Sequence, residues 1–130
     1  MRILKYVLMT LFLLINISYA NFINLNGVET TATGDTIELP GMVSSHTVDC
    51  YFDTSGGGVT ALTIDLEGSI DNSKWYSLAS HDFDTAELAA KRAMIHVVNK
   101  PVTYVRCHIT TLTETGTTTV YARYNFMKGK

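Results

Sequence analysis

The sequence predicts an all-β domain in which two antiparallel sheets pack face to face as a β-sandwich. Apolar residues recur at every second position through most of the chain after residue 20. Short runs of β-branched and aromatic residues are separated by Gly, Ser, Asn and Asp, and a single segment is rich in helix formers. About seven short strands with both faces to cover favour two packed sheets, of immunoglobulin-like or jelly-roll-like type.

Residues 1–20 have the pattern of an export signal. Two basic residues precede an apolar run over residues 6–15, and the small residues Ser18 and Ala20 follow it. Because a helix needs about 20 apolar residues to span a bilayer, this run is too short for a permanent anchor. We therefore expect cleavage after Ala20 and a single secreted domain over residues 21–130, periplasmic or extracellular and without a membrane span.

The charge distribution argues against a nucleic-acid partner. After residue 20 the chain has eight basic and twelve acidic residues, which gives a net charge of −4. Nucleic-acid-binding proteins usually gather their basic residues on one face. Here the basic residues are scattered along the chain: Lys74, Lys91, Arg92, Lys100, Arg106, Arg123, Lys128 and Lys130.

The first half of the domain contains two predicted strands joined by a glycine turn. In the stretch SHTVDCYF, the residues Val48, Cys50 and Phe52 share one face, and polar residues alternate with them. The stretch VTALTIDLEG, residues 59–68, alternates in the same way. The glycines at 56–58 supply the positive φ values that a hairpin loop requires.

The second half predicts further strands over residues 75–78, 93–98, 103–112 and 118–126. The stretch DTAELAAKRA is rich in helix formers, and Asp84 or Thr85 can cap it, so we expect one short helical connection. A threonine run, Thr117–Thr119, leads into the last strand. We expect this strand to lie at or near a sheet edge, where unpaired backbone groups allow strand addition.

Trp75, the only tryptophan, follows the turn-like stretch GSIDNSK. A small sandwich needs large residues to close its core, and burial of this side chain would contribute about 2–3 kcal/mol. The alternative is a sugar-binding surface formed by Trp75 and Tyr76, although neighbours on a strand point to opposite faces. We expect Trp75 to be buried, with Trp75 and Tyr76 as the candidate ligand residues if it is not.

The two cysteines, Cys50 and Cys107, both fall on the predicted inward faces of their strands. An exported protein matures in a compartment that permits disulfides. A bridge would close a loop of about 57 residues and stabilise the fold by roughly 4 kcal/mol. We therefore expect a disulfide; the alternative is two separately buried thiols that behave as small apolar residues.

Two stretches, LEGSIDNSKWYSL and PVTYVRCHITTLTETGTTTVYARY, resemble a β-sandwich module common in bacteriophage virion proteins of the decoration and tail-associated kind. The resemblance rests on Leu66, Glu67, Gly68, Ser69, Asp71, Trp75, Tyr104, Val105, Arg106 and Gly116. It covers roughly residues 47–124 and implies a scaffolding or attachment role without catalytic residues. The export signal and the cysteines depart from the pattern of such modules.

The sequence offers few groups for catalysis or metal binding. It contains no Gly-x-Ser-x-Gly, His-Glu-x-x-His or Cys-x-x-Cys motif. The candidate metal ligands are Asp82, Asp84 and Glu87 in the stretch HDFDTAE. Calcium would suit these oxygens but needs six or more of them, and a solvated acidic loop is the alternative. We expect no cofactor and no catalytic residues.

Together these observations predict a secreted, non-enzymatic β-sandwich with a structural or adhesive role, as in virion-like assembly or attachment. The expected partners are another protein, a second copy of the chain, or a cell or virion surface. The alternative is a carbohydrate- or calcium-binding module that uses Trp75, Tyr76 and the acidic loop His81–Glu87.

Overall fold

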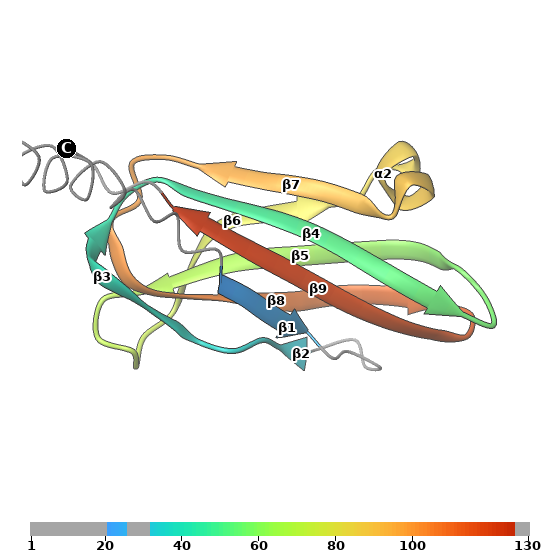
Figure 1. Ribbon diagram of the computed structural model, residues 1–130, viewed down its shortest axis with the longest axis horizontal. Coiled ribbons are helices and arrows are strands. Elements are labelled where there is room, and N and C mark those ends of the chain that lie inside the picture. Colours follow the sequence, from blue (N-terminus) through green and yellow to red (C-terminus); the bar gives the residue numbers. More distant parts are fainter. Residues whose placement is uncertain (1–20, 26–31, 127–130) are drawn as a thin grey trace, which may run out of the picture.

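The computed structural model describes residues 21–25 and 32–126 of the chain (Figure 1). The predicted signal, residues 1–20, lies outside the described residues. No helix in the described part of the chain is long and apolar enough to cross a membrane.

Two antiparallel sheets form the two layers of a sandwich (Figure 1). The four-stranded sheet has the order β1 (Asn21–Leu25), β9 (Thr117–Phe126), β4 (His46–Ser55) and β7 (Arg92–Val97). The five-stranded sheet has the order β2 (Ala32–Thr33), β8 (Val102–Glu114), β5 (Val59–Ser69) and β6 (Tyr76–Asp82), and β3 (Ile37–Val43) also pairs with β8. The predicted fold class is confirmed.

The strand order identifies the jelly-roll-like form of the sandwich. Both β2 and β3 pair with β8 on the side away from β5, so they act as one interrupted edge strand. When β2 and β3 are counted as one strand, the sheet β1-β9-β4-β7 faces the sheet β3-β8-β5-β6. This is the strand order of a jelly roll, which consists of two interleaved Greek keys.

The last strand lies next to a sheet edge, but not at the edge itself. β9 is not an edge strand, because it pairs with β4 along its whole length and with β1 on its other side. The edges of this sheet are β1 and β7. β1 was not predicted from the sequence, so the outer neighbour of β9 was not expected.

The predicted helical connection is confirmed as α2 (Thr85–Ala90) between β6 and β7. Asp84 is its N-cap: the Glu87 backbone N–H donates to the Asp84 side chain at 2.8 Å, and the Asp84 backbone N–H donates to the Glu87 carboxylate at 2.9 Å. This reciprocal capping box satisfies backbone donors that a short helix leaves unpaired. The helix ends at Lys91, which has a left-handed backbone with φ of 58°.

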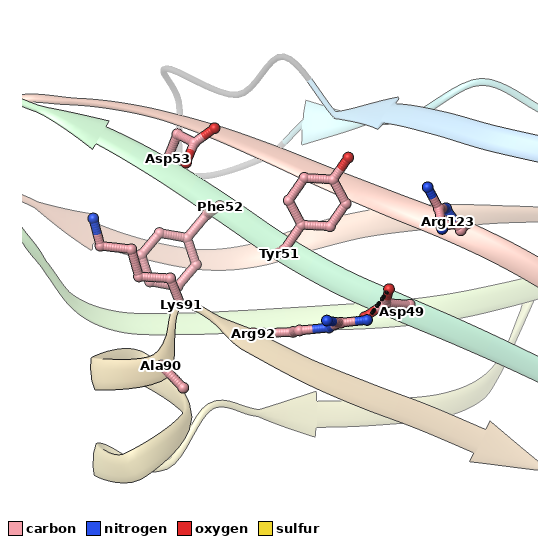
Figure 2. Close-up of a pocket in the computed structure, with 8 residues that line it drawn as sticks. All are labelled: Asp49, Tyr51, Phe52, Asp53, Ala90, Lys91, Arg92 and Arg123. Atoms are coloured by element: carbon pink, nitrogen blue, oxygen red, sulfur yellow. Dashed lines mark hydrogen bonds and ion pairs between the residues drawn. The ribbon is translucent and has the colours of Figure 1, made fainter.

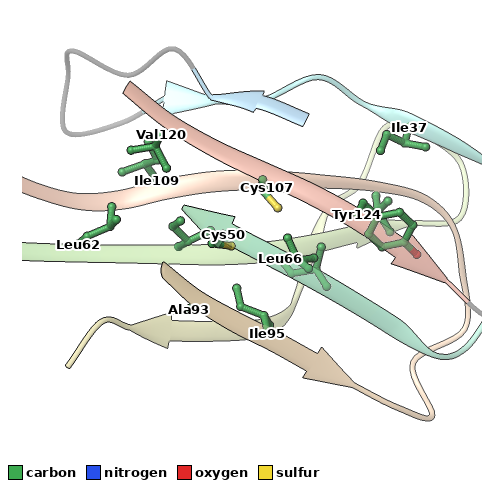
Figure 3. Close-up of a cluster of buried hydrophobic side chains, with 14 of the residues drawn as sticks. Ile37, Cys50, Leu62, Leu66, Ala93, Ile95, Cys107, Ile109, Val120 and Tyr124 are labelled. Atoms are coloured by element: carbon green, nitrogen blue, oxygen red, sulfur yellow. The ribbon is translucent and has the colours of Figure 1, made fainter. Parts of the chain in front are cut away.

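The core is formed by the inward residues of both sheets, at every second position of the long strands (Figure 3). Along β4 and β5 buried residues alternate with half-buried ones, as the sequence predicted. The side chains with no exposed surface include Val48, Ile64, Leu66, Val105 and Ile109. Each large apolar side chain buried in this way contributes roughly 1.5–3 kcal/mol.

Cys50 and Cys107 are both free and fully buried, so the predicted disulfide is wrong. They lie on β4 and β8, in different sheets of the same core (Figure 3). The two thiols are near enough for the charge of Cys50 to affect the pKa of Cys107, but they are not bonded. The cysteines instead fill the core as small apolar side chains, which is the alternative that the sequence left open.

Burial makes these thiols unreactive. Burial, with a smaller effect of the Asp49 charge, raises the pKa of Cys50 to about 12, and burial raises the pKa of Cys107 well above its usual value. We predict that Ellman's reagent detects no thiol in the native protein and two thiols in denaturant without reductant. A count of zero in denaturant would show that a bridge exists after all.

Part of the motif on which the predicted resemblance to virion modules rests forms a corner between β5 and β6. The Asp71 carboxylate accepts hydrogen bonds from Ser69 Oγ, from Ser73 Oγ and from the backbone N–H groups of Ser73 and Lys74, at 2.9 to 3.1 Å. These bonds hold the pKa of Asp71 far below its usual range. Asn72, with φ of 58°, completes the turn. This part of the motif therefore specifies a loop shape.

Gly68 provides a test of this corner. A Cβ atom at Gly68 would lie 2.7 Å from Val102 Cγ1 and 2.8 Å from Leu78 Cδ1, because β5, β6 and β8 meet there. We predict that Gly68→Ala lowers the free energy of unfolding by about 1–3 kcal/mol, measured by urea denaturation. The matched control is Gly58→Ala, whose new Cβ atom meets nothing within 4 Å. Equal stability of the two variants would contradict close packing at the corner.

A buried histidine of β4 is hydrogen-bonded both to β9 and to the β7–β8 turn at the same end of the sandwich. The Tyr124 hydroxyl donates to Nδ1 of His46 at 2.5 Å, and Nε2 of His46 donates to the carbonyl oxygen of Lys100 at 2.8 Å. Neither His46 nor Tyr124 has exposed side-chain surface. Burial lowers the pKa of His46 from its usual 6.5, so the neutral ring is the stable form in the core.

This arrangement predicts acid sensitivity. Below pH 6.5 the unfolded chain binds a proton at His46 that the folded chain does not bind, so the free energy of unfolding falls as the pH falls. Denaturation at pH 7.5 and pH 5.5 measures this loss. The loss in free energy of unfolding should be smaller in His46→Gln and unchanged in His96→Gln, which replaces an exposed histidine. An unchanged loss in His46→Gln would exclude His46 as its source.

Candidate functional site

Trp75 lies on the outer surface of the five-stranded sheet, and the prediction that it is buried in the core is wrong. Its side chain is half-buried, and the Arg106 guanidinium carbon lies 4.2 Å from the ring centroid. Nε of Arg106 also donates to the Glu67 carboxylate at 2.6 Å. Ser77 pairs with Glu67 and so shares this outer face, and Trp75 lies two residues before it. Leu78 takes the inward position instead.

Trp75 and Tyr76 do not form a common ligand surface. The cation–π contact with Arg106 covers one face of the Trp75 ring. Tyr76 pairs with Gly68, and its side chain is 65% exposed. Neighbouring strand residues point to opposite faces, so the two rings cannot lie side by side as one flat platform.

The acidic loop is occupied by structural contacts and lies at the other end of β6. Asp82 accepts from the Thr63 hydroxyl at 2.7 Å, Asp84 caps α2, and Nε2 of His81 lies 2.9 Å from the Glu87 carboxylate. Within the described residues, no three His, Cys, Asp or Glu side chains are arranged to hold a metal ion. Figure 1 shows α2 and the β5–β6 loop at opposite ends of the sandwich.

An open hollow of about 450 Å³ lies on the outer face of the four-stranded sheet, beside α2 (Figure 2). Its lining residues are Asp49, Tyr51, Phe52, Asp53, Ala90, Lys91, Arg92 and Arg123. We call the surrounding surface the tyrosine face and define it by Tyr51, Tyr121, Asp49, Arg92, Met94 and Arg123. None of these six residues was predicted from the sequence to belong to a site.

The charged part of the tyrosine face is held in a fixed geometry. Nε and Nη2 of Arg92 each donate to one oxygen of the Asp49 carboxylate at 2.7 Å (Figure 2). The hydrogen bonds and the charge of Asp49 raise the pKa of Arg92. Arg123 lies directly opposite Asp49 in the register between β4 and β9. An exposed pair of this kind adds little stability, but its bidentate geometry orients both side chains.

The aromatic part of the face is a pair of stacked tyrosines. Tyr51 and Tyr121 are directly opposite each other on β4 and β9, with ring centroids 5.0 Å apart and planes inclined by 18°. Each ring therefore covers part of one face of the other. Met94 pairs with Asp49 on the same surface, and its side chain is 61% exposed.

The sequence indicates which residues of the tyrosine face point outward, but it does not indicate that their strands lie side by side. Tyr51, Tyr121 and Arg123 fall at outward positions of predicted strands, where polar residues are expected. That several of them are aromatic or basic is unusual for a plain solvated face. However, β4 meets β7 and β9 through pairings between residues far apart in the chain, which a period of two does not reveal.

The chain matches no known protein family, and no curated protein matches it. Among solved structures it is similar to CBM32-3 from a family 31 glycoside hydrolase of Clostridium perfringens, with a TM-score of 0.56, 16% identity, and coverage of 87% of this chain and 80% of that chain.

Two further structures show weaker likeness. The SPBc2 prophage-derived protein YomS has a TM-score of 0.46 and 14% identity over 88% of this chain and 98% of that chain. The C-terminal domain of a chitobiase from Bacteroides fragilis has a TM-score of 0.46 and 14% identity over 77% of this chain and 67% of that chain. At these identities the likeness is one of β-sandwich fold.

Proposed function

We propose that this chain is a secreted, non-enzymatic structural protein that assembles with copies of itself through the tyrosine face. The observation that carries the proposal is the stacked pair of Tyr51 and Tyr121 beside the bidentate pair of Asp49 and Arg92. Tyrosine, arginine and methionine are enriched in protein interfaces, and tyrosine and arginine often dominate their binding energy. Stacking holds the two rings in place before binding, which lowers the entropy lost on association.

Self-association is favoured because the face carries both signs of charge. Asp49 and Asp53 lie beside Lys91, Arg92 and Arg123 around one hollow. In a two-fold symmetric dimer the same surface meets itself, so acidic groups of one copy can face basic groups of the other. A surface of one sign would repel its own copy.

Catalysis is a poorer explanation for this surface. An active site needs ionisable groups with shifted pKa values in a cleft, whereas this hollow is open. The carboxylate of Asp49 is already paired with Arg92. The nearby thiol of Cys50 points into the core and has a pKa of about 12.

Sugar binding is also less well supported. A sugar stacks on an aromatic ring whose face is open, but Tyr51 and Tyr121 stack on one another, and Arg106 covers one face of Trp75. CBM32-3 is named as a carbohydrate-binding module, but at 16% identity its likeness concerns the fold.

Sedimentation velocity of the chain from Asn21 to Lys130 tests this proposal. We expect a shift from monomer to dimer between about 1 and 100 μM. The double variant Tyr51→Ser/Tyr121→Ser should raise the dissociation constant at least about tenfold, because both rings leave the centre of the interface.

The matched control is Tyr76→Ser, which removes an equally large exposed ring away from the tyrosine face. It should leave the dissociation constant unchanged. A protein that remains monomeric over the whole range, or an equal loss in the control, would overturn the proposal.

A further inference from the structure

Exposed apolar side chains gather at one end of the sandwich. Among the described residues, the large hydrophobic side chains that are more than half exposed are Met42, Ile70, Tyr76, Met94 and Val98. All except Met94 lie in or beside connections at the end where β3, β5 and β7 finish. We call Met42, Ile70, Tyr76 and Val98 the apolar end.

The strand register brings these connections together. Val43, next to Met42, pairs with Val102 at the start of β8. Tyr76 pairs with Gly68, just before Ile70 in the chain, and a Cβ atom at Gly68 would touch Val102.

The β7–β8 turn, which contains Val98, joins the same end. The Lys100 backbone N–H donates to the carbonyl oxygen of Ser44 at 3.2 Å, which ties this turn to the β3–β4 turn. Figure 1 shows the three connections at one end of the molecule, at the left of the view.

Basic residues accompany the apolar side chains. Lys74 follows Ile70 in the β5–β6 loop, Lys100 follows Val98 in the β7–β8 turn, and both lysines are exposed. Asp71 is the acidic residue of these connections, and its carboxylate is bonded within its own loop. The end therefore presents apolar side chains next to positive charge.

The N-terminal apolar segment joins the fold at this end. Asn21, the first residue of β1, pairs with Tyr124 near the end of β9. The apolar run over residues 6–15 is separated from Asn21 by residues 16–20, which span at most about 20 Å. If that run enters a membrane as part of the predicted export signal, the short tether keeps the apolar end close to the same bilayer.

We propose that the apolar end docks the exported domain on an anionic lipid surface. Its apolar side chains project from separate loops, an arrangement that a fluid bilayer accommodates more easily than a rigid protein surface. Tyrosine at the interface, apolar side chains below it and lysines beside anionic headgroups are the features of peripheral membrane binding. This contact is independent of the tyrosine face and does not require the self-association proposed above.

Vesicle co-sedimentation of the chain from Asn21 to Lys130 tests the inference. We expect binding to vesicles of phosphatidylglycerol and phosphatidylcholine, weaker binding to phosphatidylcholine alone, and release by salt. The variant Met42→Ser/Val98→Ser should weaken binding at least about fivefold, because each inserted side chain contributes to the affinity. Lys74→Gln/Lys100→Gln should weaken binding to the anionic vesicles only.

Matched controls come from the rest of the molecule. Met94→Ser removes a methionine of the same 61% exposure as Met42, but from the tyrosine face. Lys91→Gln removes an exposed lysine at the opposite end. Both should bind vesicles as the unchanged protein does, and thermal unfolding of every variant verifies that it is folded.

The outcomes separate this inference from the proposed function. Failure to bind anionic vesicles, or an equal loss in Met94→Ser, overturns the lipid contact. Dimerisation that is lost in Met42→Ser/Val98→Ser, without vesicle binding, would assign the apolar end to a second copy instead. Tyr51→Ser/Tyr121→Ser should lose self-association and keep vesicle binding.

Discussion

The apolar contact between the inner faces of the two sheets is the constraint on which the rest of this structure depends. Most inward positions of β4, β5, β8 and β9 are apolar, and the largest buried polar side chain among the described residues, His46, has both ring nitrogens paired. An unpaired polar atom there would lose its hydration without compensation. The same contact explains why the cysteines serve as packing residues and why the ionisable groups with free access lie on the outer faces and at the ends.

The fold class could be predicted because a period of two is a local property of the chain. Burial along β4 and β5 follows the alternation read from the sequence, and the capping residues of α2 lie within three positions of one another. Trp75 was misplaced because alternation gives two faces without saying which one is inward. The residue of β6 that points inward is Leu78, and its side chain packs against Gly68 on the neighbouring strand β5.

The candidate surfaces were harder to predict because they depend on pairings between distant segments. The tyrosine face requires β4 to meet β9, and the apolar end requires three connections to converge. One part of the motif on which the predicted resemblance to virion modules rests is local, and another part depends on strand pairing. Its Ser69 and Asp71 form a turn through local hydrogen bonds, and its Glu67, Trp75 and Arg106 brace the sheet around that turn.

The pairing of β1 with β9 has a consequence for biogenesis. The first described strand hydrogen-bonds to the last, and β4 also pairs with β9 along its whole length. The four-stranded sheet therefore cannot close until the C-terminal part of the chain has emerged, and such long-range pairing makes folding slow. A chain that stays open until its last strand arrives remains threadable through a narrow translocation channel. The topology thus delays closure of the sandwich until the last strand is available, which is compatible with the export proposed above.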